Sequence, residues 1–450
     1  MKPSFLDYKR RFHVLRCIMV VSLLLAILCS NQSQAATVKT GAEILSEEGF
    51  QSLKGKRFAL VTNQSELLSG VHLIELMRRM GVRPAVIFTP EHGFKGAAED
   101  GVQLADGTVA GIPVRSLYGT AKKPRPEDLA GLDLVLFDIQ DAGVRFYTYI
   151  STMGLVMQAA AEAGVPFVVL DRPNPLGGSY VSGFVRHELP ATFTSLYTIP
   201  VAHGMTVGEL AGMIKGEGML PGLARLELSV VRMHGWQRWM RWPDTGLPWL
   251  ATSPNLASFE SALLYPGIGL LEATSASEGR GSEQPFRLAG WPGVDSQAMA
   301  RGLNSQELAG LHFEPARFTP VSIPGRESAP KYKNRELGGV RIEITDYRRV
   351  LPVEAGVAVI EALYAALQEP ARKVFFKAGF DDMAGSAQLR HGVQVGETAH
   401  TVIARWSDEV HSFLALRQGY LLYHDEPARR EEIAALPHPF AHPAPLSPRP

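Results

Sequence analysis

The sequence has very little cysteine: Cys17 and Cys29 are the two in 450 residues, and both lie in an apolar segment near the N-terminus. A basic stretch precedes this segment and the small residues Ser33-Gln34-Ala35 follow it, which is the order of features in a secretory signal peptide. We therefore expect residues 1–35 to be cleaved and the protein to be secreted, into the periplasm. The mature chain would then have no disulfide, no thiolate nucleophile and no cysteine-bound metal.

A long hydrophobic run is also absent. The apolar segment from Cys17 to Cys29 is shorter than the ~20 residues that cross a bilayer, so signal cleavage is favoured over an uncleaved membrane anchor. Lipidation of Cys29 is disfavoured because the preceding Ala26-Ile27-Leu28 lacks the small residue expected just before a lipidated cysteine. We expect no membrane span once the signal is removed.

Neither sign of charge is in excess, since 45 Lys and Arg residues face 45 Asp and Glu residues. Loss of the basic signal leaves the mature chain mildly acidic, which argues against a nucleic-acid partner and is compatible with a neutral or anionic small substrate. The content of 46% apolar and 20% charged residues is typical of globular proteins, and the length predicts two domains. The sequence does not define the oligomeric state.

Several common catalytic motifs are missing. No G-x-G-x-x-G/A follows the first expected strand, and there is no Walker sequence, no H-E-x-x-H and no G-x-S-x-G. These absences weigh against nucleotide, zinc-protease and serine-hydrolase chemistry, and we expect no cofactor and no metal. What remains is a set of carboxylates flanked by aromatic and amide residues, which is suited to general acid/base work on a glycosidic bond.

The N-terminal half alternates short β-rich runs with helix-like stretches, the pattern of an α/β domain with a parallel sheet. The expected strands are residues 57–61, 84–88, 134–137 and 166–170, with helices at 71–80 and 152–163. A second, smaller α/β domain is expected from further patterns at 339–345, 353–367 and 392–406. We place the domains at 37–265 and 266–436, followed by a Pro-rich disordered tail at 437–450.

Each expected strand is followed by a polar loop: residues 62–64, 89–93, 138–141 and 171–175. Ligands of open α/β sheets bind outside the carboxyl ends of the strands, so these loops should converge on one site. Chance clustering of turn residues is the alternative. Within these loops Glu91 is the leading catalytic candidate, because an enclosed glutamate can have a raised pKa and donate a proton. It could equally cap a turn or pair with Arg115 or Arg145, and His92 alone would more often be structural.

Two further segments are dense in functional groups. Residues 137–149 include Asp138, Gln140, Arg145 and Tyr147, which suggest a binding wall, although an ion-pair network of Asp138, Asp141 and Arg145 would explain the same residues. Residues 272–286 place Arg280 between two glycines, so it could hold a carboxylate. A local ion pair with Glu278 or Glu283 is the alternative.

Taken together, these segments resemble the NamZ-type exo-β-N-acetylmuramidase family over nearly the whole mature chain. The motifs that carry the resemblance occur in family order: residues 61–65, 88–96, 116–119, 138–149, 171–175, 203–209, 253–255 and 277–281. The sequence departs from the family pattern at Thr274-Ser275 and at Ser282-Glu283, which puts substrate preference within the family in question.

The resemblance implies a Rossmann-like parallel-sheet domain followed by a smaller α/β (α+β) domain, with the active-site cleft between them. It also implies release of N-acetylmuramic acid from the non-reducing ends of peptidoglycan-derived saccharides. Glu91 falls at the position expected to be catalytic, as the proton donor, and Asp138, Glu272 and Glu278 are open candidates for the second carboxylate. The expected substrate-binding residues are Asn63, His92, Tyr118, Gln140, Arg145, Tyr147, Asn174, His203, Asn255, Glu272 and Arg280.

Locally, His203 and Asn255 are each more typical of a turn or cap than of a ligand contact, and the Thr206-x-x-Glu209 spacing is a capping box. Two readings from other classes stay open at this point: a periplasmic binding protein that captures cell-wall sugars without cleaving them, and an interaction protein that docks on peptidoglycan. A binder would use the aromatic residues and Arg280 but needs no perturbed glutamate.

Overall fold

The computed structural model describes residues 38–425 except 66, 69 and 188, and these residues belong to one compact unit that begins at Val38. The expected signal peptide and Pro-rich tail lie outside the described residues. Within the described part of the chain, no helix is long and apolar enough to cross a membrane.

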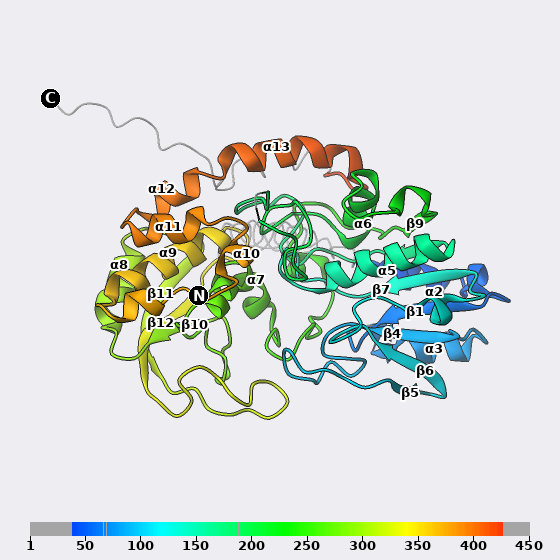
Figure 1. The fold of residues 1–450 in the computed structure, drawn as a ribbon, viewed down its shortest axis with the longest axis horizontal. Coiled ribbons are helices and arrows are strands. Elements are labelled where there is room, and N and C mark those ends of the chain that lie inside the picture. Colours follow the sequence, from blue (N-terminus) through cyan, green and yellow to red (C-terminus); the bar gives the residue numbers. More distant parts are fainter. Residues whose placement is uncertain (1–37, 66, 69, 188, 426–450) are drawn as a thin grey trace, which may run out of the picture. The chain divides into compact units, whose positions relative to one another are not determined.

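A seven-stranded sheet forms the centre of the N-terminal half, in the strand order β5-β6-β4-β1-β7-β8-β9 (Figure 1). The pairs are parallel except for β5 with β6, which confirms the expected α/β class. In chain order the strands are β1 (Phe58–Thr62), β4 (Val86–Thr89), β5 (Gly107–Val109), β6 (Ile112–Ser116), β7 (Leu134–Asp138), β8 (Phe167–Leu170) and β9 (Leu228–Val231). The four expected strands are β1, β4, β7 and β8, with ends within two residues of those predicted.

Helices cover both faces of this sheet because alternate residues of each buried strand point to opposite sides. Phe58 and Leu60 of β1 belong to the apolar cluster that includes α2 (Gly41–Glu47) and α3 (Leu73–Arg79). Ala59 and Val61 belong instead to the cluster that includes α5 (Tyr149–Ala163) and α6 (Val207–Gly216). The core therefore lies on both sides of the sheet, as in doubly wound folds.

The expected helix at 71–80 begins later than predicted. Val71 and His72 form a short hairpin strand, β3, with β2 (Leu67–Leu68), and α3 begins at Leu73. The expected helix at 152–163 begins earlier, at Tyr149, and ends at Gly164, whose left-handed conformation (φ 66°) suits a glycine. The capping box of Thr206 and Glu209 is present at the start of α6.

The C-terminal half contains a three-stranded antiparallel sheet with the strand order β10-β12-β11. Of its three strands, the sequence predicted only β12. Its strands are β10 (Leu288–Trp291), β11 (Leu311–Phe318) and β12 (Leu337–Ile344). The remaining α-helices are α4 (Pro126–Leu129), α7 (Phe259–Ile268), α8 (Ser296–Asn304), α9 (Pro352–Ala366), α10 (Phe380–Ala384), α11 (Gln388–Gln394), α12 (Ala399–Ala404) and α13 (Ser407–Arg417). The segment at 392–406 thus forms parts of two short helices.

Helices α7 and α9 pack closely because glycines face each other at their crossing. A Cβ atom added to Gly356 of α9 would overlap the backbone of Gly267 in α7. This contact packs α7, which follows the N-terminal half, against α9 of the C-terminal half.

After α13 (Figure 1), the chain forms a short 3-10 helix, η6 (Gln418–Tyr420), and the residues at the end of this part contact the N-terminal half. The Arg417 guanidinium donates to the carbonyls of Gly178 (3.0 Å) and Gly204 (2.7 Å). Tyr423 donates its hydroxyl to Asp171, directly after β8, at 2.7 Å. Residues 417–423 therefore complete the packing around the N-terminal sheet, and we call them the C-terminal clasp.

Candidate functional site

The carboxyl ends of the central parallel strands lie at one edge of the sheet, as their register requires. Thr62 pairs with Asp138, and Val61 pairs with Phe88, so the loops after β1, β4 and β7 start side by side. Three of the four polar loops therefore begin at the same edge of the sheet, and the loop after β4 carries Glu91.

Glu91 has both carboxylate oxygens hydrogen-bonded and remains half-buried. The amide of Gly101 donates to Oε1 at 3.0 Å, and the hydroxyl of Thr148 donates to Oε2 at 2.9 Å. Thr148 is the N-cap residue of the 15-residue helix α5, so the positive end of that helix dipole also lies beside the carboxylate. The Gly101 amide and the start of α5 thus hold the Glu91 carboxylate in place.

Tyrosine side chains surround Glu91 on the sheet side. Burial, together with the nearby Glu91 carboxylate, raises the pKa of Tyr118, so its hydroxyl stays protonated. Tyr149 donates to the carbonyl of Thr252 at 2.6 Å and packs against Tyr147 with ring centroids 4.6 Å apart. Tyr147 in turn meets Tyr265 of α7 at 5.9 Å. This aromatic wall leads from Glu91 to the C-terminal half.

Arg280 lies at the other side of the site and contacts four carboxylates of the protein. Its Nη2 binds Glu272 Oε1 at 2.5 Å and also contacts Asp100, from the loop that carries Glu91. Glu327 lies 3.4 Å from Nη1, and Glu278 lies 3.7 Å from Nε. The ion-pair alternative for Glu278 is therefore present, and Arg280 joins loops from both halves of the chain.

Glu272 is the most unusual acid of this group. Burial raises its pKa to about 7, and the neighbouring Asp100 and Glu278 carboxylates add to the rise, whereas Arg280 opposes it. Its side chain is nevertheless 23% exposed, so a ligand can reach it. A carboxyl group that is partly protonated near neutral pH can donate a proton.

Glu278 and Asp138, expected as catalytic candidates, are engaged in buried ion pairs. Glu278 is 3% exposed and binds Lys331 at 2.7 Å. Asp138 is fully buried, and its two oxygens accept from Nε and Nη2 of Arg172 at 2.6 and 3.0 Å. The structure therefore favours a positioning role for both, because neither carboxylate is open to a substrate.

Arg145 does not form part of a binding wall. It is fully buried, and its guanidinium donates to the carbonyls of Phe184 and Ile199 at 2.7 Å and to that of Met383 at 2.8 Å. The ion-pair network proposed as the alternative for Asp138, Asp141 and Arg145 is also corrected, because Arg145 binds carbonyl groups and Asp138 binds Arg172. Arg145 instead links the N-terminal half to α10.

Four other expected ligand residues hold loops together. Asn174 donates to the carbonyl of Met205 at 3.0 Å, and His203 accepts at Nδ1 from the Met205 amide at 3.2 Å. Asn255 donates to the carbonyl of Arg326 at 3.0 Å, across to the C-terminal half. Gln140 donates to the carbonyl of Pro173 at 2.8 Å. All four side chains are buried, so they support the loops of the site from within the protein.

Asn63 lies closer to the reacting region. Its side-chain oxygen accepts from the amide and hydroxyl of Ser65 at 3.0 and 2.7 Å, whereas its amide nitrogen has no partner among the described residues. Burial raises the pKa of Tyr149 well above its ordinary value, and the nearby Glu91 carboxylate adds to the rise, whereas Asn63 opposes it, so the three side chains lie together. Asn63 is itself fully buried, so it supports this group from within the protein.

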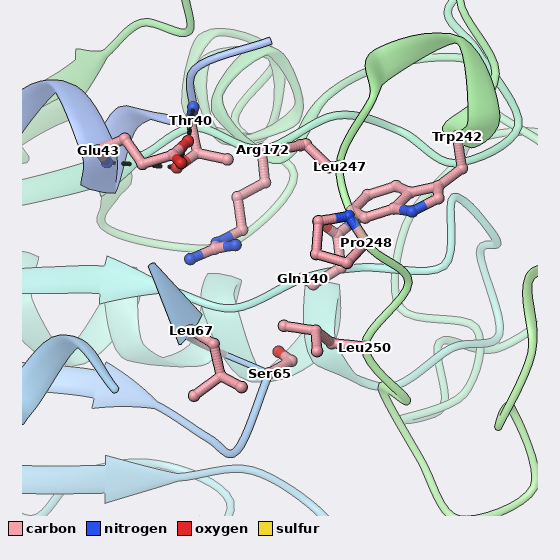
Figure 2. A pocket seen from close by; sticks show the side chains of 10 residues that line it. All are labelled: Thr40, Glu43, Ser65, Leu67, Gln140, Arg172, Trp242, Leu247, Pro248 and Leu250. Carbon is pink, nitrogen blue, oxygen red and sulfur yellow. Dashed lines mark hydrogen bonds between the residues drawn. The ribbon is translucent and has the colours of Figure 1, made fainter. Parts of the chain in front are cut away.

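A separate small cavity opens at the edge of the sheet (Figure 2). It has a volume of about 30 Å³, with Gln140 and Arg172 beside a wall that includes Leu247, Pro248 and Leu250. A single water needs roughly 10–15 Å³ of such volume, so this cavity has room for water but is too small for a sugar ring.

Several site residues were missed by sequence reasoning. Asp100 and Thr148 contact Glu91 or its neighbours, and Tyr265, Glu327 and Lys331 come from the C-terminal half. Asp100 stands in the sequence Glu99-Asp100-Gly101 within the same polar loop as Glu91, which was a usable signal. The other residues reach the site only through the folding of distant segments.

Comparison with known proteins gives matches over most of the chain. Residues 58–260 match the family model described as exo-beta-N-acetylmuramidase NamZ, N-terminal, and residues 263–423 match its C-terminal counterpart. The peptidoglycan beta-N-acetylmuramidase NamZ of Bacillus subtilis (strain 168) is 38% identical over 393 residues, covering 86% of this chain and 91% of that protein.

Two solved structures of DUF1343 family proteins from Bacteroides fragilis are also similar. One has a TM-score of 0.78 at 35% identity, covering 86% of this chain and 99% of its own. The other has a TM-score of 0.72 at 31% identity, covering 87% and 100% respectively.

Proposed function

The chain belongs to the NamZ family of exo-β-N-acetylmuramidases, and from that membership we propose that it removes the terminal N-acetylmuramic acid residue from the non-reducing end of peptidoglycan fragments. It is a glycoside hydrolase, and its substrates are saccharides that end in N-acetylmuramic acid. The reaction serves cell-wall turnover and recycling.

The observation that carries the mechanism is that Glu91 and Glu272 are connected through Asp100 and Arg280 but lie in different environments. Glu91 and Asp100 belong to one loop of the N-terminal half, and Asp100 and Glu272 both contact Arg280. Glycoside hydrolases use a pair of carboxyl groups in different environments, one as the acid and one as the carboxylate. Arg280 therefore holds acids of the protein in place, as the ion-pair alternative expected.

We assign proton donation to Glu272, in place of the earlier assignment to Glu91. The Glu272 carboxyl, with a pKa raised to about 7, gives its proton to the glycosidic oxygen as the bond from that oxygen to the anomeric carbon breaks. Glu91 accepts two hydrogen bonds and acts as the carboxylate that faces the positive charge at the anomeric carbon. Water supplies the hydroxyl group of the released sugar, and its remaining proton returns the carboxyl pair to its starting state.

The test uses a chromogenic β-N-acetylmuraminide and the matching β-N-acetylglucosaminide with the mature protein and three variants. Glu91→Gln and Glu272→Gln should each lower turnover of the muraminide by about a hundredfold or more, because each keeps the shape but removes the ionisable group. Glu283→Gln is the matched control, since Glu283 is 85% exposed and pairs with Arg326 at the surface. No release of chromophore from the muraminide would reject the proposed function, and full activity of Glu91→Gln would reject the mechanism.

We also propose that the protein acts outside the cytoplasm, on the basis of the signal-like sequence of residues 1–35. Peptidoglycan lies outside the cytoplasmic membrane, so export would bring the enzyme to its substrate. Fractionation of cells that express the full chain should recover a protein whose first residue is Ala36, in the periplasm. A full-length protein in the cytoplasm would reject this proposal.

A further inference from the structure

Three side chains in the loop after β4 bring metal-ligating atoms together. One carboxylate oxygen of Glu91, a ring nitrogen of His92 and one carboxylate oxygen of Asp100 all lie within 4.8 Å of one another. Because Glu91 and His92 are adjacent in one turn, the group is built from a single loop, residues 91–100. No metal was expected from the sequence, which lacks H-E-x-x-H and has no cysteine outside residues 1–35.

The orientation of His92 is the observation that separates this group from an ordinary acidic patch. Its Nδ1 lies 2.7 Å from the carbonyl oxygen of Ala98, and a carbonyl can only accept, so Nδ1 is the donor of this hydrogen bond. The other ring nitrogen, Nε2, lies 3.5 Å from Asp100 Oδ1. The ring is 4% exposed, so water cannot readily separate these two atoms.

Nε2 of His92 and a carboxylate oxygen of Asp100 face each other, so a metal ion between them would be held by both groups. A histidine whose second nitrogen donates to a backbone carbonyl is the arrangement that orients metal-binding imidazoles. His92 is therefore already held in the geometry of a metal ligand.

The surrounding charge also favours a cation. Arg280 and Lys331 between them contact the four carboxylates of Asp100, Glu272, Glu278 and Glu327. The Glu91 carboxylate stands beside this group, with its nearest oxygen within 4.8 Å of that of Asp100. Negative charge thus exceeds positive charge among these contacts, and a divalent ion would reduce the excess.

We propose that Glu91, His92 and Asp100 bind a divalent transition-metal ion of the Zn²⁺ type, and that this ion inhibits hydrolysis by occupying Glu91. One imidazole and two carboxylates suit Zn²⁺, whereas Mg²⁺ and Ca²⁺ prefer oxygen ligands alone. Bonds to Zn²⁺ of about 2.0–2.2 Å require the three atoms to approach by roughly an ångström. Asp100 can make this movement because it is 38% exposed, and its second oxygen keeps its contact with Arg280.

The binding test is titration of the metal-free mature protein with ZnCl₂ in a calorimeter. One Zn²⁺ should bind per chain, and His92→Gln and Asp100→Asn should each weaken binding by at least about tenfold. Asp106→Asn is the matched control, because Asp106 lies in the same loop region but contacts Arg115 and the Ser116 amide instead. It should bind Zn²⁺ as the unchanged protein does, and MgCl₂ should give no binding heat.

Stoichiometric binding that both ligand variants leave unchanged, or no binding at all, would overturn the proposed site. A rise in the melting temperature on addition of ZnCl₂, lost in the two ligand variants, is the second readout, and it also shows that the variants fold. The inhibitory part rests on the proposed function, and half-inhibition of muraminide hydrolysis should occur at the calorimetric Kd. Zn²⁺ binding without any hydrolysis would keep the site and reject the function, whereas hydrolysis without Zn²⁺ binding would do the reverse.

Discussion

Replacing Asp100 by asparagine should move the alkaline limb of the pH profile of the enzyme to lower pH. Asp100 and Glu272 contact the same guanidinium nitrogen of Arg280, and the Asp100 carboxylate helps to keep the pKa of Glu272 raised, at about 7. If Glu272 donates the proton, the active form exists below this pKa, and kcat/KM falls as the pH rises through it. Removing the negative charge of Asp100 makes ionisation of Glu272 easier, so the fall begins at lower pH.

The size of the movement follows from Coulomb's law. Two carboxylates that share one guanidinium are about 6 Å apart, and an effective dielectric constant of roughly 20 to 40 gives about 1.4 to 2.8 kcal/mol of repulsion. Because one pH unit corresponds to about 1.4 kcal/mol, this is roughly one to two pH units. Asp100 is 38% exposed and screened by solvent, so the lower figure of about one pH unit is expected.

The assay is kcat/KM for the chromogenic muraminide between pH 5 and 9, which reports the ionisations of the free enzyme. Asp106→Asn serves again as the control and should leave the alkaline limb in place. An alkaline limb of Asp100→Asn that stays where it is, or moves to higher pH, would refute the assignment of Glu272 as proton donor. Metal-free buffers keep this measurement separate from the Zn²⁺ site.

Two further predictions concern stability. Gly356→Ala should lower the free energy of unfolding by about 2–3 kcal/mol in a denaturant titration, because the added methyl group overlaps the backbone of Gly267. Gly302→Ala is the control and should be neutral or stabilising, because Gly302 lies in a helix with open space around it. Equal effects of the two substitutions would contradict the packing argument. Tyr423→Phe should cost about 1–3 kcal/mol at pH 7, because it removes a donor from the buried Asp171 carboxylate. Burial raises the pKa of Asp171 to about 6, above its unfolded value, so its contribution to stability is complete below the unfolded pKa and falls as the pH rises through 6. The cost of Tyr423→Phe should therefore be smaller at pH 5 than at pH 7, and a cost that did not depend on pH would contradict this account.

The sheet could be predicted where its strands are buried on both faces. Strands β1, β4 and β7 are fully buried, and β8 nearly so, which gives the continuous apolar runs that the sequence shows. Strands β5 and β9 lie at the two edges and are partly or fully exposed, so their apolar signal is weak. The antiparallel pairing of β10 and β11 with β12 depends on contacts between distant segments.

The position of the candidate site, at the carboxyl ends of the parallel strands, could be predicted better than the roles of its residues. Glu91 followed from its place after a buried strand, and Arg280 from its glycine-flanked loop. Arg145 was misread because a sequence does not show whether a guanidinium faces a ligand or three backbone carbonyls. The ion-pair partner of Asp138 could not be predicted either, since Arg172 is 34 residues away in the chain.

Because of the C-terminal clasp, complete folding of the N-terminal half depends on residues at the other end of the described chain. Tyr423 and Asp171 are separated by 252 residues, and Arg417 and Gly178 by 239, yet both pairs close the packing of the first half. Contacts of such separation form late and slow folding, because a long loop must close before they stabilise anything. A polypeptide that emerges N-terminus first from a ribosome can therefore pair all seven strands of the sheet, β1 to β9, before the clasp has been synthesised. The buried Asp171 carboxylate and the Gly178 and Gly204 carbonyls gain their partners from Tyr423 and Arg417 only when residues 417–423 have followed.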